Sequence, residues 1–157
     1  MAKLRRLWCP TFPWGEGLPL TTLIRISVVL DTNVLIASAF RPGSDSARIV
    51  GAVRDGRLTM LWDVPTRGET ERLFRKIPPI SWEAVAGLYL EENRWTGELD
   101  AAAWTRVSDP EDRKFAALAD AGGALLVSLD AHLLRAGLGT QPEVLTPSEL
   151  VARLNRP

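Results

Sequence analysis

The sequence has few of the residues on which several functional classes depend. Among its 157 residues, Cys9 is the only cysteine and His132 the only histidine. A disulfide framework and a cysteine-ligated zinc site within one chain are therefore excluded, which agrees with a reducing cytoplasm. No apolar run is as long as a membrane span, so we expect a cytoplasmic protein that does not bind membranes. The formal net charge of zero excludes a global basic field, so an anionic substrate must be held locally.

The composition is that of one folded domain with an unusual beginning. Apolar residues make up 46% of the chain and charged residues 24%, which is enough for a hydrophobic core and a solvated surface. The first residues are rich in proline and glycine and show no hydrophobic period. They start with basic residues but lack the apolar stretch of a signal peptide. We expect residues 1–26 to be a disordered or atypical extension, or a misassigned start, and residues 27–155 to form the domain.

Strand and helix patterns alternate along the rest of the chain. Apolar, β-branched runs predict strands, and helical periodicity with capping residues predicts helices between them. This alternation indicates an α/β fold, a three-layer α/β/α sandwich with a mostly parallel central sheet. The expected strands are 23–31, 57–62, 104–107, 124–129 and 143–145. The expected helices are about 33–40, 44–54, 65–76, a helix capped by Ser81, 109–122, a short helix after Asp130, and a last one capped by Thr146.

Acidic residues recur where this fold places ligands. Asp31 and Asp130 each end an apolar strand, and Asp112 lies in the first turn of an expected helix. Ligands of parallel α/β sheets bind beyond the carboxyl ends of the strands. Glu69 shares one side of its helix with Leu73, so its carboxylate faces the core. We therefore expect these four acids to gather at one edge of the sheet.

Each acid also has an ordinary structural interpretation. Asp31 and Asp130 could cap the helices that follow them, and Asp112 could be only a first-turn acid that the helix dipole favours. Thr66 and Glu69 fit a capping box. Together, however, clustered carboxylates repel one another and need a cation, and an all-oxygen set favours Mg²⁺ or Mn²⁺ over zinc. Such sites commonly perform phosphoryl chemistry. A lone histidine such as His132 is more often a surface or packing residue than a catalyst.

Four segments resemble PIN-domain ribonucleases, especially the single-domain VapC-like toxins of type II toxin–antitoxin systems. The segments are VVLDTNVLIAS, ETERLF, DPEDRKFAALA and LLVSLDAHLL, and they follow the family order. By position, Asp31, Glu69, Asp112 and Asp130 match the four acids of the family. Asn33 and Ser128 match its supporting polar residues, with serine in place of a commoner threonine. The stretch 95–104 shows no clear family pattern, and the extension is not typical, since many members begin close to the first strand.

The resemblance implies a PIN-like fold and a metal-dependent endoribonuclease. The four acids would hold Mg²⁺ or Mn²⁺, and a metal-activated water would cleave RNA to leave 5′-phosphate and 3′-hydroxyl ends. Asp31 and Asp130 would contact the metal directly. It also implies a homodimer and a small antitoxin partner. The cations that could contact the RNA are Arg41, Arg67, Arg113 and Lys114, although for each of them an ordinary solvated charge is the more common role.

Other functions fit parts of the same pattern. A PIN nuclease of RNA maturation or turnover needs no antitoxin, and a small open reading frame upstream would distinguish the two. A non-catalytic RNA-binding PIN module conflicts with the complete set of acids. An α/β phosphatase with a nucleophilic aspartate would need a second aspartate where the sequence has Asn33.

Overall fold

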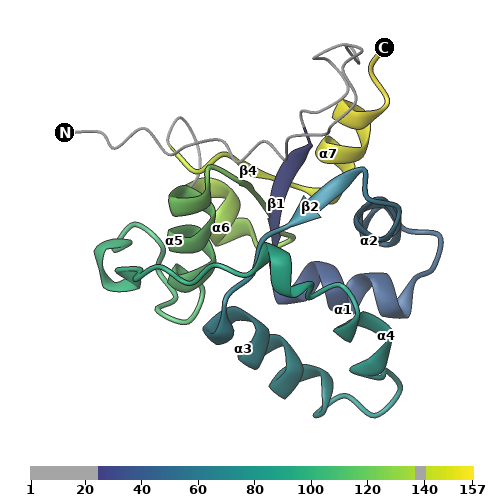
Figure 1. Cartoon of the computed structure of the whole chain (residues 1–157), viewed down its shortest axis with the longest axis horizontal. Helices are drawn as coiled ribbons and strands as arrows, with labels where there is room; N and C mark the ends of the chain where they lie inside the picture. The colour runs from purple at the N-terminus through teal and green to yellow at the C-terminus, as the bar shows by residue number, and fades with distance from the viewer. Residues whose placement is uncertain (1–24, 137–140) are drawn as a thin grey trace, which may run out of the picture.

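A four-stranded parallel sheet forms the centre of the protein (Figure 1). The structure, a computed structural model, describes residues 25–136 and 141–157. The strand order is β2-β1-β3-β4, and every pair of neighbours is parallel. This confirms the predicted α/β class. The strands are β1 (Ile26–Leu30), β2 (Leu58–Met60), β3 (Leu125–Val127) and β4 (Val144–Leu145).

Helices connect the strands and cover both faces of the sheet (Figure 1). The α-helices are α1 (Thr32–Phe40), α2 (Asp45–Arg54), α3 (Val64–Phe74), α4 (Glu83–Ala86), α5 (Arg113–Gly122), α6 (Ala131–Ala136) and α7 (Pro147–Leu154). Two short 3-10 helices, η2 (Glu91–Asn93) and η3 (Ala101–Ala103), lie in the connection between α4 and α5. Among the described residues, no helix is long and apolar enough to cross a membrane.

The alternating side chains of β1 divide the core into two parts. Val28 and Leu30 pack into a cluster with residues of α1, α2 and α7 on one face. Val29 packs into a second cluster with residues of α5 and α6 on the other face. All three valine and leucine side chains are buried. The sheet is therefore the middle layer of an α/β/α sandwich, as the period-two alternation of a strand requires.

Several predicted element boundaries are correct for the expected reasons. Ser44 caps α2, and its side chain accepts a hydrogen bond from the Ala47 amide. Thr146 and Glu149 form the capping box of α7. Gly123, at the end of α5, has a φ of +61°, which favours glycine over other residues.

Three local predictions are wrong. Residues 104–107 form turns after η3 rather than a strand, and Trp104 and Val107 pack on the second core cluster instead. The helix expected from Asp109 begins only at Arg113, because residues 109–112 form a turn in which Asp109 accepts the Glu111 amide. The helix expected after Ser81 is only the short α4.

The capping box expected at Thr66 and Glu69 is also wrong, by one turn. Asp63 caps α3, and its partner in the box is Thr66. Glu69 is therefore free of any capping role. The prediction for residues 1–26 falls almost entirely outside the described ranges. Within these, Ile26 begins β1.

Candidate active site

Asp31 lies at the carboxyl end of β1, next to the matching end of β3. Leu30 pairs with Val127 in the parallel register, so Asp31 and Ser128 follow as neighbours. Asp31 is 3% exposed, and its side chain does not cap α1. Instead, the buried Ser128 hydroxyl donates a hydrogen bond of 2.8 Å to its Oδ2. The simple capping interpretation of Asp31 is therefore wrong.

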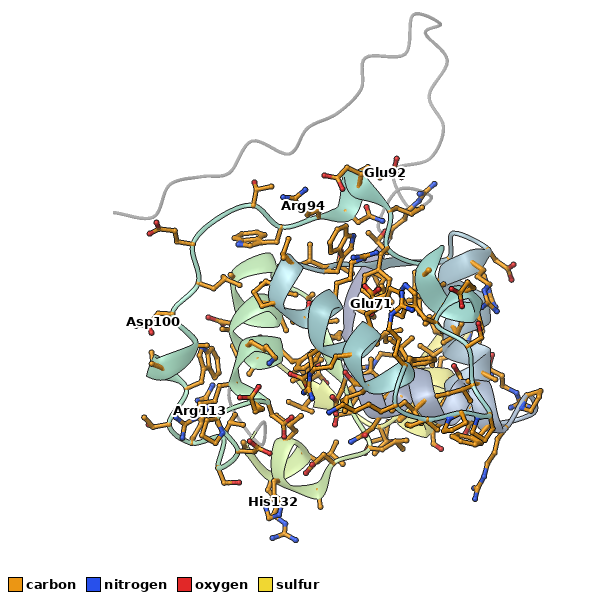
Figure 2. The ribbon with its side chains drawn as sticks, turned by 90° about the horizontal axis from the view of Figure 1, so that it is seen from below. Glu71, Glu92, Arg94, Asp100, Arg113 and His132 are labelled. Atoms are coloured by element: carbon orange, nitrogen blue, oxygen red, sulfur yellow. The ribbon has the colours of Figure 1, made fainter. Side chains whose placement is uncertain are left out.

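Ser128 also holds the chain at Asp130. Its hydroxyl oxygen accepts a hydrogen bond of 2.9 Å from the Asp130 amide. Asp130 then caps α6 with one carboxylate oxygen, Oδ1, which accepts the His132 amide at 2.7 Å. The capping interpretation is thus confirmed for Asp130, and this hydrogen bond uses only Oδ1. The His132 side chain is exposed and lies at the outer edge of the molecule (Figure 2).

Glu69 reaches the site from α3 and is paired with a lysine of α5. Its side chain is 10% exposed and forms an ion pair with Lys114, which is 20% exposed. Lys114 forms a second ion pair, of 2.9 Å, with Glu111. Burial lowers the pKa of Lys114, but its hydrogen bonds to the two glutamates outweigh burial and raise the pKa above the ordinary value. One acid of the predicted set therefore has a cation of the same chain beside it.

Asp112 occupies the N-cap position of α5 but does not cap the helix with its side chain. Burial raises its pKa to about 7, and repulsion from Asp31, Asp109, Asp130 and Glu69 adds to the shift. Because the charges of all three other predicted acids raise the pKa of Asp112, its carboxyl group lies near them. The structure therefore brings the four acids to one region, built from β1, α3, α5 and the end of β3.

The carboxyl group of Asp31 lies near the same negative charges. Burial raises its pKa to about 6, while the hydrogen bonds from Ser128 and the Thr32 backbone favour the ionised form. Repulsion from Asp130 and Glu69 adds to the effect of burial. Two carboxyl groups whose pKa values are raised toward neutral pH by burial and by charged neighbours are typical of a functional site.

A buried hydroxyl pair that sequence reasoning missed joins two of the contributing helices. The Thr32 and Thr70 hydroxyl oxygens lie 2.8 Å apart, and Thr70 also donates to the Thr66 carbonyl. The pair connects α1, which follows Asp31, to α3, which carries Glu69. The position of Thr70 one residue after Glu69 was the available signal. The predicted helper Asn33, by contrast, has an exposed side chain.

The four cations predicted to contact RNA have different surroundings. Arg67 makes an ion pair of 3.4 Å with Glu71 and lies over the ring of Trp82, 5.3 Å from its centroid. Arg113 donates to the Val107 carbonyl at 2.8 Å. Lys114 belongs to the acid cluster, and Arg41 is exposed at the end of α1. Arg67 and Arg113 are thus already engaged in holding the fold.

The four carboxylates of the cluster are chemically suited to bind a hard divalent cation. In the described part of the chain, no three acidic or histidine side chains are arranged to hold a metal ion as they stand. All four acids nevertheless offer carboxylate oxygens, the ligands that Mg²⁺ and Mn²⁺ prefer. Burial, and then repulsion between the acids, raises the pKa values of Asp31 and Asp112, and Glu69 is paired with Lys114.

The class of this protein is defined by a parallel α/β/α sandwich with an acid cluster, including the buried Asp31, beyond the carboxyl ends of its central strands. A family model described as "PIN domain" matches residues 27–132, so the chain belongs to the PIN domain family. PIN domains are generally nucleases that use divalent metals, which supports a hydrolase activity for this chain. No curated protein sequence matches the chain.

Two solved structures show the same fold. PAE2754 from Pyrobaculum aerophilum is 19% identical, with a TM-score of 0.53 over 83% of this chain and 98% of that one. A structure described as FitAB bound to an IR36 DNA fragment is 15% identical, with a TM-score of 0.52 over 76% of this chain and 94% of that one. At these identities the likeness concerns the fold.

Proposed function

We propose that this protein is a Mg²⁺- or Mn²⁺-dependent endoribonuclease and the toxin of a toxin–antitoxin pair. The observation that carries the proposal is the hydrogen-bonded arrangement of Asp31, Ser128 and Asp130 beyond β1 and β3, with Glu69 and Asp112 close enough to repel them. Family membership supplies the nuclease class. The resemblance of the acid motifs to VapC-like proteins supplies RNA as the substrate.

The residues of the site have separable roles in this proposal. Ser128 fixes the orientation of the Asp31 carboxylate and holds the backbone at Asp130. Asp31 and the uncapped oxygen of Asp130 would then be the direct metal ligands. Glu69 and Asp112 would add negative charge to the site, and each would either ligate the cation or orient water. A bound Mg²⁺ or Mn²⁺ would lower the pKa of a water molecule and neutralise charge on the phosphate.

Substrate contacts must offset a site that is itself acidic. Phosphate groups of RNA are positioned by a few basic side chains rather than by net charge. Arg41 is exposed at the end of α1, the helix that begins after Asp31, and is a candidate for this role. Lys114 is a second candidate because it already lies among the acids. A homodimer and inhibition by a small antitoxin complete the proposal by resemblance to VapC-like proteins, and the single cysteine agrees with a cytoplasmic location.

The proposal is tested by cleavage of a structured RNA pool. Purified protein is incubated with Mg²⁺, with Mn²⁺ or with EDTA, beside an Asp31→Asn variant, and the product ends are sequenced. We expect metal-dependent cuts that leave 5′-phosphate and 3′-hydroxyl ends and that fall by at least a hundredfold in the variant. Asp120→Asn, an exposed change on α5, is the matched control and should cleave like the wild type. Cuts that persist in Asp31→Asn, or in EDTA, would refute the proposed site.

A further inference from the structure

Lys114 connects the acid cluster to solvent through two glutamates of different exposure. On one side its ammonium pairs with Glu69, whose side chain is 10% exposed. On the other side it pairs at 2.9 Å with Glu111, whose side chain is 71% exposed. Glu69 comes from α3, whereas Glu111 lies in the turn before α5. The same ammonium thus has one partner inside the site and one at its rim.

The inner ion pair differs in kind from the ion pairs on the surface of the protein. Exposed pairs contribute little, because water screens both charges. Glu69 and Lys114 are both largely removed from water, and Asp31 and Asp112 lie close enough to Glu69 for their charges to repel it. A cation in such a field is held more firmly than one at the surface. Electrostatic attraction therefore strongly favours this ion pair in the metal-free protein.

We propose that Lys114 is the resident counter-ion of Glu69, competes with the divalent cation for that carboxylate, and moves to Glu111 when the cation binds. The inference rests on the proposed function, because it concerns the same four acids. A monovalent ammonium offsets part of the repulsion while the site lacks its metal. Glu111 then keeps the displaced ammonium at the rim. Lys114 is a positioning residue in this scheme, since it acts on the reaction through Glu69.

Competition makes a prediction opposite to that for a lysine that assists metal binding. Removal of the ammonium frees Glu69 and leaves the cluster more negative, so a divalent cation should bind more tightly. Binding of Mn²⁺ is measured by isothermal titration calorimetry on the full-length wild-type protein and on Lys114→Met. We expect at least about fivefold tighter binding in the variant, because a competing ion pair that is shielded from water is lost. Lys114→Arg keeps the charge and should bind Mn²⁺ within about twofold of the wild type.

A matched control separates this local competition from a change in net charge. Lys76 is exposed just after α3, and Lys76→Met removes the same charge without touching the acids. We expect the Mn²⁺ affinity of Lys76→Met to equal that of the wild type. A double-mutant cycle then tests the partner. In a Glu69→Gln background, which weakens the competing pair, the additional change Lys114→Met should alter Mn²⁺ affinity by less than about twofold.

The outcomes distinguish the inference from the function on which it rests. Unchanged or weaker Mn²⁺ binding by Lys114→Met overturns the inference, while metal-dependent cleavage by the wild type keeps the proposed function. An equal gain in the Glu69→Gln background also overturns it, because the effect would not pass through Glu69. A wild-type protein that binds no Mn²⁺ and cleaves no RNA refutes the proposed function together with the inference. Circular dichroism of each variant confirms that the fold is intact.

Discussion

The hydroxyl of Ser128 donates a 2.8 Å hydrogen bond to Asp31, a residue 97 positions earlier in the chain. Both residues directly follow paired positions of β1 and β3, so the parallel register brings them together. Both are buried, and the same hydroxyl accepts the Asp130 amide. One serine thus orients one acid of the site and fixes the backbone of another.

Loss of the Ser128 hydroxyl should impair both stability and catalysis. Ser128→Ala leaves the buried Asp31 oxygen and the Asp130 amide without their partner, which costs about 1–3 kcal/mol of unfolding free energy. RNA cleavage should fall by at least tenfold, because Asp31 loses its orientation. Ser128→Thr keeps the hydroxyl and should retain most activity. Urea denaturation and cleavage rates measure the two effects, and equal activity of the alanine and threonine variants would contradict the assigned role.

Asp31→Asn should stabilise the metal-free protein at high pH. Burial raises the pKa of Asp31 from 3.8 to about 6, so Asp31 stays protonated to a higher pH in the folded state than in the unfolded state. The penalty of ionising Asp31 therefore grows from about pH 4 to about pH 6 and is complete above that range. We expect a gain of about 1–3 kcal/mol at pH 8 and almost none at pH 4.

The stability measurement needs a metal-free protein and a control carboxylate. Urea denaturation in EDTA at the two pH values gives the free energies of unfolding. Asp120→Asn removes an exposed carboxylate on α5 and should show no comparable gain at pH 8. A loss of stability in Asp31→Asn at pH 8 would show that the ionised carboxylate stabilises the fold, which contradicts the expected penalty of burying it.

The Thr32 and Thr70 pair predicts a link between packing and catalysis. Thr70→Val keeps the shape but leaves the buried Thr32 hydroxyl without its partner, at a cost of about 1–2 kcal/mol. Because Thr70 follows Glu69 on α3, the RNA cleavage rate should also fall. The double variant Thr32→Val with Thr70→Val removes both hydroxyls and should recover part of the stability. Additive losses in urea denaturation would show that the two hydroxyls act independently.

The fold was predictable because its signals are local and agree with one another. The apolar run before Asp31, the capping box at Thr146 and the glycine at Gly123 each identify one element without tertiary information. Their alternation then leaves few arrangements other than a parallel sheet. The connection between α4 and α5 was not predictable in the same way. Its apolar residues Trp104 and Val107 suggested a strand, but they pack in the core cluster that contains residues of α5.

The location of the four acids in one region could be predicted from the sequence, but their partners could not. Periodicity placed Glu69 on the inner side of α3, and the structure agrees. The ion pair with Lys114 and the pair of Thr32 with Thr70 depend on how α3 packs against α5 and α1, which no sequence period encodes. The helix start at Asp109 failed for a related reason. Asp–Pro is a good start signal, but the chain forms a turn there before α5 begins.

The anomalous scattering of crystals soaked in Mn²⁺ tests most directly whether the four acids form a metal site. We predict one or two peaks within ligand distance of the Asp31 and Asp130 carboxylates, near Glu69 and Asp112, and no such peaks in Asp31→Asn. Well-diffracting crystals with Mn²⁺ bound elsewhere and none at these acids would contradict the central claim that this edge of the sheet is a metal-dependent active site.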